Sequence, residues 1–286
     1  MKVYTLDAFT SAAGGGNPAG VVLDSAGLTD RQMLLIAAKV GFSETAFIFP
    51  SDKANFRLRF FTPREEVPLC GHATIAAFKL LHLKGLLPSK ELCQETGAGL
   101  LRLRVEEGLI HMEQALPKFT DVLPGEEIAD SLGLSASDLH EHLPPQIVST
   151  GLADIMIPLR SLEALRTFRP DFEKIKKISA KYAVIGYHVF SLETLHGACA
   201  CCRNLAPLCG IDEEAATGTS NGALSCYLYK QGRLREEDLR SLRFEQGYFM
   251  DRPSEIFASL KTENGKIRQV FVGGDAVLRE SLEISF

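Results

Sequence analysis

The segment LCGHAT at residues 69–74 opens a stretch that ends at Gly85, and the segment TGTSN at residues 217–221 opens another that ends at Gly232. Each stretch carries apolar residues at helical spacing after a glycine loop, which predicts a helix that is stopped by glycine. The two intervals are equal, about 14 residues each by their numbering (71 to 85 and 218 to 232). Equal units favour two structurally similar halves. The alternative is a coincidence between two ordinary amphipathic helices.

Strand and helix signals alternate along the rest of the chain. Residues 2–8 alternate as in a strand, and Thr29 with Gln32 forms a capping box before an amphipathic helix. Residues 101–114 predict a hairpin that turns near Gly108. Helical signals over residues 162–181 are broken by Pro170. This alternation predicts a protein that contains both strands and helices.

Bulk composition excludes several functional classes. The 286 residues carry a net charge of -5, with 45% hydrophobic and 23% charged residues, and no strongly basic stretch marks a nucleic-acid partner. No apolar run is long enough for a membrane span, and the N-terminal segment does not resemble a signal peptide. Seven cysteines, an odd number without a disulfide framework, favour reduced thiols and a cytoplasmic location.

Two glycine loops and two side chains are candidates for chemistry. A helix entered through glycine exposes free N–H groups, so the two loops could together hold a carboxylate. Glu44 begins an apolar segment, where burial would raise its pKa toward neutrality and suit it to proton transfer. His72 could share a proton with Glu44. The alternative interpretations are that the glycine loops are only tight helix entries, that Glu44 is an exposed glutamate, and that His72 only caps the helix or packs against it.

Other polar clusters are weaker candidates. Of the acidic residues 212–214, at most one is expected to be functional, because most such runs are solvated surface. Cys199, Cys201 and Cys202 do not follow a zinc-ligand spacing, so buried strand cysteines are favoured and no metal site is expected. Nucleotide-binding, zinc-protease and nucleophile-elbow motifs are also missing from the sequence.

Short segments along almost the whole chain resemble the PhzF-like phenazine-biosynthesis family. They occur in the family's order, and the ordered set is far more specific than any single piece. The matching segments are residues 7–9, 16–20, 42–45, 61–63, 69–74, 95–96, 98–99, 112–117, 148–151, 216–218, 246–247, 250, 252–254 and 272–274.

The resemblance implies an α+β, diaminopimelate epimerase-like fold, in which each of two pseudo-symmetric αβ halves wraps a sheet around a central helix. We place the N-terminal half at residues 1–118, to which a strand at about 276–286 could return, and the C-terminal half at residues 119–275, with the crossing near residues 117–124. The resemblance further implies an active site between the halves, no metal or organic cofactor, and a small carboxylate substrate.

The resemblance also implies roles for individual residues. In the characterised isomerase of the family, a glutamate at the position of Glu44 moves a proton between carbons of a cyclic dihydro-hydroxy-anthranilate. A histidine at the position of His72 and an aspartate near the second glycine loop assist, and Glu214 stands nearest to that aspartate. The residues that would lie against the substrate are Ser43, Cys70, Gly71, Gly218 and Thr219.

Two departures from the pattern bear on mechanism. The family's Asp-Pro step is Glu214-Ala215 here, and this longer carboxylate without the rigid proline puts the phenazine precursor itself in doubt. Racemases of the same fold use one cysteine before each glycine loop; Cys70 matches the first, but Thr217 replaces the second. A hydroxyl has far too high a pKa to act as the second thiolate.

A proton-shuttling isomerase is therefore expected, and a homodimer is the expected assembly because closed twofold assemblies are common. The alternatives are an amino or imino acid epimerase, racemase or dehydratase that uses Cys70, and a ligand-binding relative without catalysis.

Overall fold

The computed structural model describes residues 1–285 and divides them into two compact units. Unit 1 comprises residues 1–113 together with the segment from residue 273 onward, and unit 2 comprises residues 114–272. The chain thus returns to the first unit at its C-terminal end, because the strand at residues 276–283 pairs with the strand at residues 2–8.

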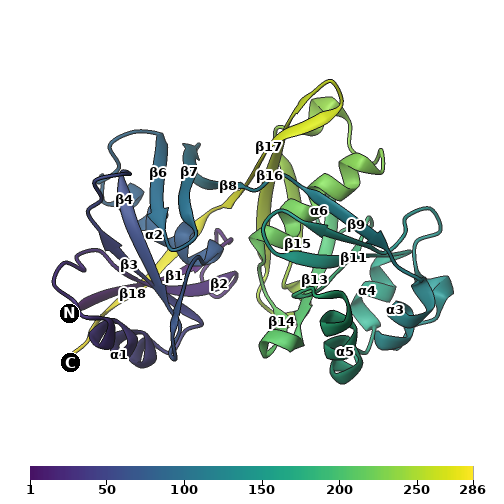
Figure 1. The fold of residues 1–286 in the computed structure, drawn as a ribbon, viewed down its shortest axis with the longest axis horizontal. Coiled ribbons are helices and arrows are strands. Elements are labelled where there is room, and N and C mark those ends of the chain that lie inside the picture. Colours follow the sequence, from purple (N-terminus) through teal and green to yellow (C-terminus); the bar gives the residue numbers. More distant parts are fainter. Residues whose placement is uncertain (286) are drawn as a thin grey trace. The chain divides into compact units, whose positions relative to one another are not determined.

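Unit 1 is built from strands around one long helix, with a second helix outside the sheet (Figure 1). Its elements are β1 Lys2–Ala8, β2 Asn17–Val22, α1 Asp30–Val40, β3 Glu44–Phe49, β4 Phe56–Phe61, β5 Glu66–Val67, α2 Gly71–Leu83, β6 Glu91–Thr96, β7 Gly99–Glu106, β8 Leu109–Gln114 and β18 Ala276–Glu283.

Unit 2 has the same kinds of element in a similar order. They are β9 Lys118–Val122, α3 Gly125–Ser131, η1 Ala136–Asp138, β10 Gln146–Ser149, β11 Ala153–Leu159, α4 Leu162–Thr167, α5 Phe172–Tyr182, β12 Gly186–Ser191, β13 Ala200–Ala206, η2 Pro207–Cys209, β14 Ile211–Glu214, α6 Gly218–Lys230, η3 Glu236–Asp238, β15 Leu242–Gln246, η4 Tyr248–Met250, β16 Ser254–Glu263 and β17 Lys266–Gly274.

Strand pairing follows one pattern in both units. In unit 1 the strands pair in the order β18, β1, β2, β3, β4, β6 and β7, of which β2–β3 and β4–β6 are parallel and the other pairs antiparallel. In unit 2 the order is β9, β10, β11, β12, β13, β15 and β16, of which β11–β12 and β13–β15 are parallel. The short strands β5 and β14 pair with β4 and β13. The shared pattern confirms two similar αβ halves.

A central helix fills each sheet, and its burial on all sides explains its apolar sequence. Both α2 and α6 have 13 residues, of which nine are buried. In unit 1, α2 contacts β1, β2, β3 and β18; in unit 2, α6 contacts β10, β11 and β16. Gly85 and Gly232 follow these helices with φ of 67°, a left-handed conformation that favours glycine. The two helices predicted from the repeat are thereby confirmed.

Outer helices cover the other face of each sheet. Met33 and Ile36 of α1 pack with Val22 and Phe47 in unit 1. In unit 2, α4 and α5 form a core with β11 and β12. The capping box at Thr29, the hairpin at Gly108 and the helix break around Pro170 are all observed as expected. Within residues 1–285, none of the helices has the length and apolar character that a membrane crossing requires.

Candidate active site

Four polar side chains of unit 1 converge where β2, β3 and α2 begin. Glu44 is the first residue of β3, which runs parallel to β2 with Glu44 beside Ala19. His72 is the second residue of α2, and Ser43 directly precedes β3. Asn17 begins β2. Strand pairing and the glycine entry to the central helix therefore bring together residues that are far apart in the sequence.

His72 is the centre of this cluster and is only 7% exposed. Its Nε2 atom lies 3.1 Å from Glu44 Oε2 and 3.3 Å from Ser43 Oγ, and its Nδ1 atom lies 3.3 Å from the Asn17 amide nitrogen. Nε2 therefore faces Glu44 and Ser43, and Nδ1 faces the amide group of Asn17.

Cys70 completes the cluster as the N-cap residue of α2. Its Sγ atom lies 3.6 Å from Nδ1 and 3.8 Å from Nε2 of His72, and the side chain is buried. Burial raises the pKa of the Cys70 thiol, with the nearby Glu44 charge adding to the effect. The thiol is accordingly neutral near pH 7, which makes it a poor base.

The pKa of Glu44 is lowered, which corrects the expectation that burial would raise it toward neutrality. Burial is the largest single influence and does oppose ionisation, but contacts with His72, Ser43 and Cys70 together outweigh it. Burial also opposes protonation of His72, yet the neighbouring Cys70 and Glu44 groups raise its pKa well above its ordinary value. Glu44 and His72 thus form an ion pair at neutral pH.

The ligand atoms of Glu44, Cys70 and His72 lie within 4.8 Å of one another, a spacing that could also hold a metal ion. A carboxylate, a thiolate and an imidazole are ligands that Zn²⁺ accepts. Among the described residues this is the one such group. Cys201 and Cys202 are buried in β13 as expected, whereas Cys199 is only partly buried and directly precedes that strand; all seven cysteines are free.

In unit 2, the three acidic residues of β14 have different surroundings. Asp212 is exposed. Glu213 forms a two-pronged ion pair with Arg203, with oxygen–nitrogen distances of 2.9 and 2.7 Å. Glu214 accepts a 2.9 Å hydrogen bond from the Thr217 hydroxyl, beside the glycine loop that starts α6. Glu214 is thus hydrogen-bonded to the loop, whereas Glu213 is paired with Arg203.

Both central helices begin without a side-chain cap. Neither N-cap side chain, Cys70 for α2 or Thr217 for α6, accepts a cap hydrogen bond within the described part of the chain. The first N–H groups of each helix, at Gly71 and Gly218, carry the partial positive charge of the helix start. The backbone at Thr219 is fixed by a hydrogen bond, because its carbonyl oxygen accepts from Thr150 Oγ1 at 3.1 Å.

The candidate residues thus fall into one group per unit. Ser43, Glu44, Cys70 and His72 come together in unit 1 with Asn17, which the sequence reasoning did not single out although it lies in a family-like segment. Glu214, Gly218 and Thr219 lie together in unit 2.

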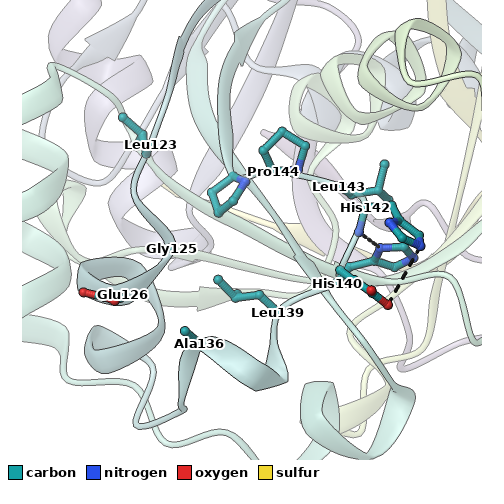
Figure 2. Close-up of a pocket in the computed structure, with 11 residues that line it drawn as sticks. Leu123, Gly125, Glu126, Ala136, Leu139, His140, His142, Leu143 and Pro144 are labelled. Carbon is teal, nitrogen blue, oxygen red and sulfur yellow. Dashed lines mark hydrogen bonds and ion pairs between the residues drawn. The ribbon is translucent and has the colours of Figure 1, made fainter.

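A hollow of about 500 Å³ in unit 2 lies apart from these residues. Figure 2 shows its lining, which includes Leu123, Leu139, His140 and His142. His140 Nδ1 accepts a 3.1 Å hydrogen bond from the His142 backbone. None of the candidate residues lines this hollow, so we do not assign it to the chemistry.

Comparison with known proteins bears on both fold and family. The family model of phenazine biosynthesis-like proteins, PhzC-PhzF, matches residues 6–281. The chain is 35% identical over 292 residues to a Bacillus subtilis (strain 168) protein named uncharacterized isomerase YfhB, covering 98% of this chain and 97% of that one. It is 29% identical over 280 residues to trans-2,3-dihydro-3-hydroxyanthranilate isomerase of Pseudomonas chlororaphis, covering 95% of each.

Solved structures agree with this. The crystal structure of a Bacillus anthracis phenazine biosynthesis protein of the PhzF family has a TM-score of 0.90 and 32% identity, covering 100% of this chain and 99% of that one. A probable proline racemase from Agrobacterium radiobacter K84 has a TM-score of 0.62 and 14% identity, covering 99% and 92%, and bears on the fold alone. The family and the epimerase-like fold expected from the sequence are confirmed.

Proposed function

The chain belongs to the phenazine biosynthesis-like family and is an isomerase, and from that premise we propose that Glu44 moves a proton between two carbons of a small cyclic or unsaturated carboxylate. The observation that carries the proposal is the pairing of Glu44 Oε2 with His72 Nε2 at 3.1 Å at the start of α2. The name of the Pseudomonas chlororaphis relative, an isomerase of a dihydro-hydroxy-anthranilate, supports a cyclic carboxylate as the substrate class.

The proposed reaction needs only one group that removes and returns a proton. The Glu44 carboxylate takes a proton from an allylic carbon, and the electron pair of that C–H bond moves into the conjugated system of the substrate. Glu44 then delivers a proton to the far end of the system, so the double bond shifts, and in D₂O exchange of the Glu44 carboxyl proton with solvent makes that proton a deuteron. Atoms and electrons balance without an oxidant, a reductant or a second substrate.

The pKa values define the resting state of this pair. A lowered pKa keeps Glu44 in the ionised form that accepts a proton, and the same shift makes the carboxylate a weaker base. The neighbouring His72, with its raised pKa, keeps the resting carboxylate ionised. In unit 1, the N–H group at Gly71 is the proposed contact for negative charge that develops on the substrate, with Ser43 and Cys70 as further contacts. In unit 2, Gly218 and Thr219 are the proposed substrate contacts.

Glu214 is proposed as the assisting carboxylate in place of the family's aspartate. Its hydrogen bond to Thr217 holds it at the second glycine loop, where it could orient a polar substituent of the substrate. Glu213 is unsuited to that role, because Arg203 neutralises it in a largely buried ion pair.

The racemase alternative is disfavoured by the chemistry of the two loop entries. Cys70 has a raised pKa, and Thr217 offers a hydroxyl that cannot replace a second thiolate. A mechanism with two thiols on opposite faces of a carbon is therefore not supported by these residues.

Proton exchange measured by NMR in D₂O tests the proposal. The parent should place deuterium in a carbon of a cyclic amino or hydroxy carboxylate, and a dihydro-hydroxy-anthranilate is the first compound to include. Glu44→Gln should lose this exchange, while Cys70→Ser should keep it. Exchange that survives in Glu44→Gln and disappears in Cys70→Ser would replace the carboxylate mechanism with a thiol mechanism.

We further propose a cytoplasmic homodimer. The seven free cysteines support a reducing compartment. Light scattering coupled to size-exclusion chromatography measures the mass in solution. A mass near twice 31.3 kDa supports the dimer, and a mass near 31.3 kDa overturns it.

A further inference from the structure

A fully buried glutamine lies behind the second glycine loop. Gln246 ends β15 and is 0% exposed. Its Oε1 atom accepts hydrogen bonds from the Thr217 backbone N–H at 3.2 Å and from the Asn221 amide at 2.8 Å. Its Nε2 atom donates to the Glu214 carbonyl oxygen at 2.8 Å and to Thr217 Oγ1 at 3.1 Å. All four hydrogen-bonding positions of the amide are used.

The orientation of this amide follows from partners whose roles are unambiguous. A backbone N–H can only donate, so the atom that faces Thr217 N must be the oxygen of Gln246. A backbone carbonyl can only accept, so the atom that faces Glu214 O must be the nitrogen. The amide of Asn221 is likewise oriented, because its nitrogen donates to Thr217 O at 2.9 Å as well as to Gln246.

This orientation dictates the direction of the next hydrogen bond. Gln246 donates to the Thr217 hydroxyl oxygen, and the hydroxyl proton is therefore free to point to Glu214 Oε2, 2.9 Å away. The order of donors runs from Gln246 through Thr217 to the carboxylate of Glu214. The one titratable group in this network is Glu214.

The backbone next to Gln246 also requires close packing against this loop. Gly247 has a φ of 77°, and a Cβ atom there would lie 2.6 Å from the Ala215 carbonyl oxygen and 2.3 Å from the Arg252 carbonyl oxygen. Only glycine allows this approach, which brings the end of β15 within reach of residues 214–217.

We propose that Gln246 is a positioning residue that acts through Thr217 to hold the Glu214 carboxylate in its working orientation. This inference rests on the proposed role of Glu214 in the isomerisation. Gln246 itself is buried behind the loop and is assigned no contact with the substrate. Its contribution is the donated hydrogen that orients Thr217.

Three variants test the direction of this network. Gln246→Met removes both donors, so the Thr217 hydroxyl is no longer oriented toward the Glu214 carboxylate. Weakening that hydrogen bond to a charged group should lower kcat by roughly tenfold or more with little change in KM. Thr217→Val removes the hydroxyl and should have a similar effect. Gln246→Glu can donate only while its introduced carboxyl is protonated, and burial raises the pKa of such a group.

The pH dependence separates positioning from general damage. The kcat of Gln246→Glu, divided by that of the parent, should fall as pH rises and the introduced carboxyl ionises. The corresponding ratio for Gln246→Met should stay flat. The matched control is Gln146→Glu, which makes the same change at another buried glutamine of unit 2, hydrogen-bonded to Thr120. This control should show no such pH-dependent ratio.

A double-mutant cycle shows whether Gln246 acts through Glu214. In a Glu214→Gln background, Gln246→Met should cause little further loss of kcat. A full additional loss there, or a flat pH ratio for Gln246→Glu, overturns the inference. Proton exchange that persists in Glu44→Gln would instead overturn the proposed function, so the two failures are distinguishable.

Discussion

Glutamine substitutions at Glu213 and Glu214 should separate stability from catalysis at adjacent positions of one strand. Glu213 forms an ion pair with Arg203, and the side chains of Glu213 and Arg203 are 15% and 11% exposed. Glu214 faces the glycine loop through Thr217. We therefore expect Glu213→Gln to lower stability and leave the exchange reaction largely intact. Glu214→Gln should leave stability nearly unchanged and slow the exchange reaction.

The cost of Glu213→Gln can be worked from the surroundings of Arg203. Removing one partner of a buried ion pair costs about 3–5 kcal/mol. The pair here is slightly exposed, glutamine keeps one acceptor, and Arg203 retains its 3.1 Å bond to the Leu165 carbonyl and its stacking 4.0 Å from the Phe168 ring. We expect a loss of about 2 kcal/mol, or roughly 4–8 °C in Tm for a chain of this size.

Thermal unfolding by calorimetry and deuterium exchange by NMR should be measured on the same preparations. Glu214→Gln should stay within about 0.5 kcal/mol of the parent in unfolding free energy, as expected for a substitution that leaves no buried charge unpaired. Its exchange rate should fall at least tenfold. Equal Tm values for the two variants, or a loss of exchange in Glu213→Gln that matches Glu214→Gln, would refute the reasoning.

Three further outcomes are expected. The stabilisation that ionised Glu44 provides should be present above its ordinary pKa of 4.5 and lost as pH falls through its lowered pKa. The stabilisation that protonated His72 provides should be complete below pH 6.5 and lost as pH rises through its raised pKa. Unfolding free energies of the parent and of Glu44→Gln, measured across pH, check both expectations. Zn²⁺ should inhibit the exchange reaction more strongly at higher pH, because Cys70 must ionise to bind it. Cys70→Ser should weaken this inhibition, and titration with EDTA measures how readily it is reversed. Gly247→Ala should lower Tm by several degrees, because the new Cβ would meet the Ala215 carbonyl oxygen at 2.6 Å; an unchanged Tm would contradict the close packing.

Local signals in the sequence predicted the helix ends well. The capping box at Thr29 and the glycines at positions 85 and 232 act on the backbone of their own turn, so their effects do not depend on distant residues. The equal spacing of the two glycine helices also predicted two similar halves, which the matching strand pairings bear out.

Side-chain partners were harder to predict. The sequence suggested that His72 and Glu44 share a proton, and the structure places their atoms 3.1 Å apart. The expected rise in the pKa of Glu44 was wrong, because burial was considered without the balance of His72, Ser43 and Cys70. Asn17 and Gln246 lie in segments that resemble the family, but nothing in their neighbourhood along the chain indicates which polar groups they bind.

The sequence by itself determined the family, the alternating αβ order and the two glycine-entered central helices, because these depend on residues that are close together in the chain. Only the tertiary structure decided which polar groups meet. Parallel pairing of β2 with β3 and of β13 with β15 brings together residues separated by tens of positions. Because electrostatic and hydrogen-bond energies depend on distances of a few ångströms, the ionisation of Glu44 and the orientation of Glu214 follow from that pairing.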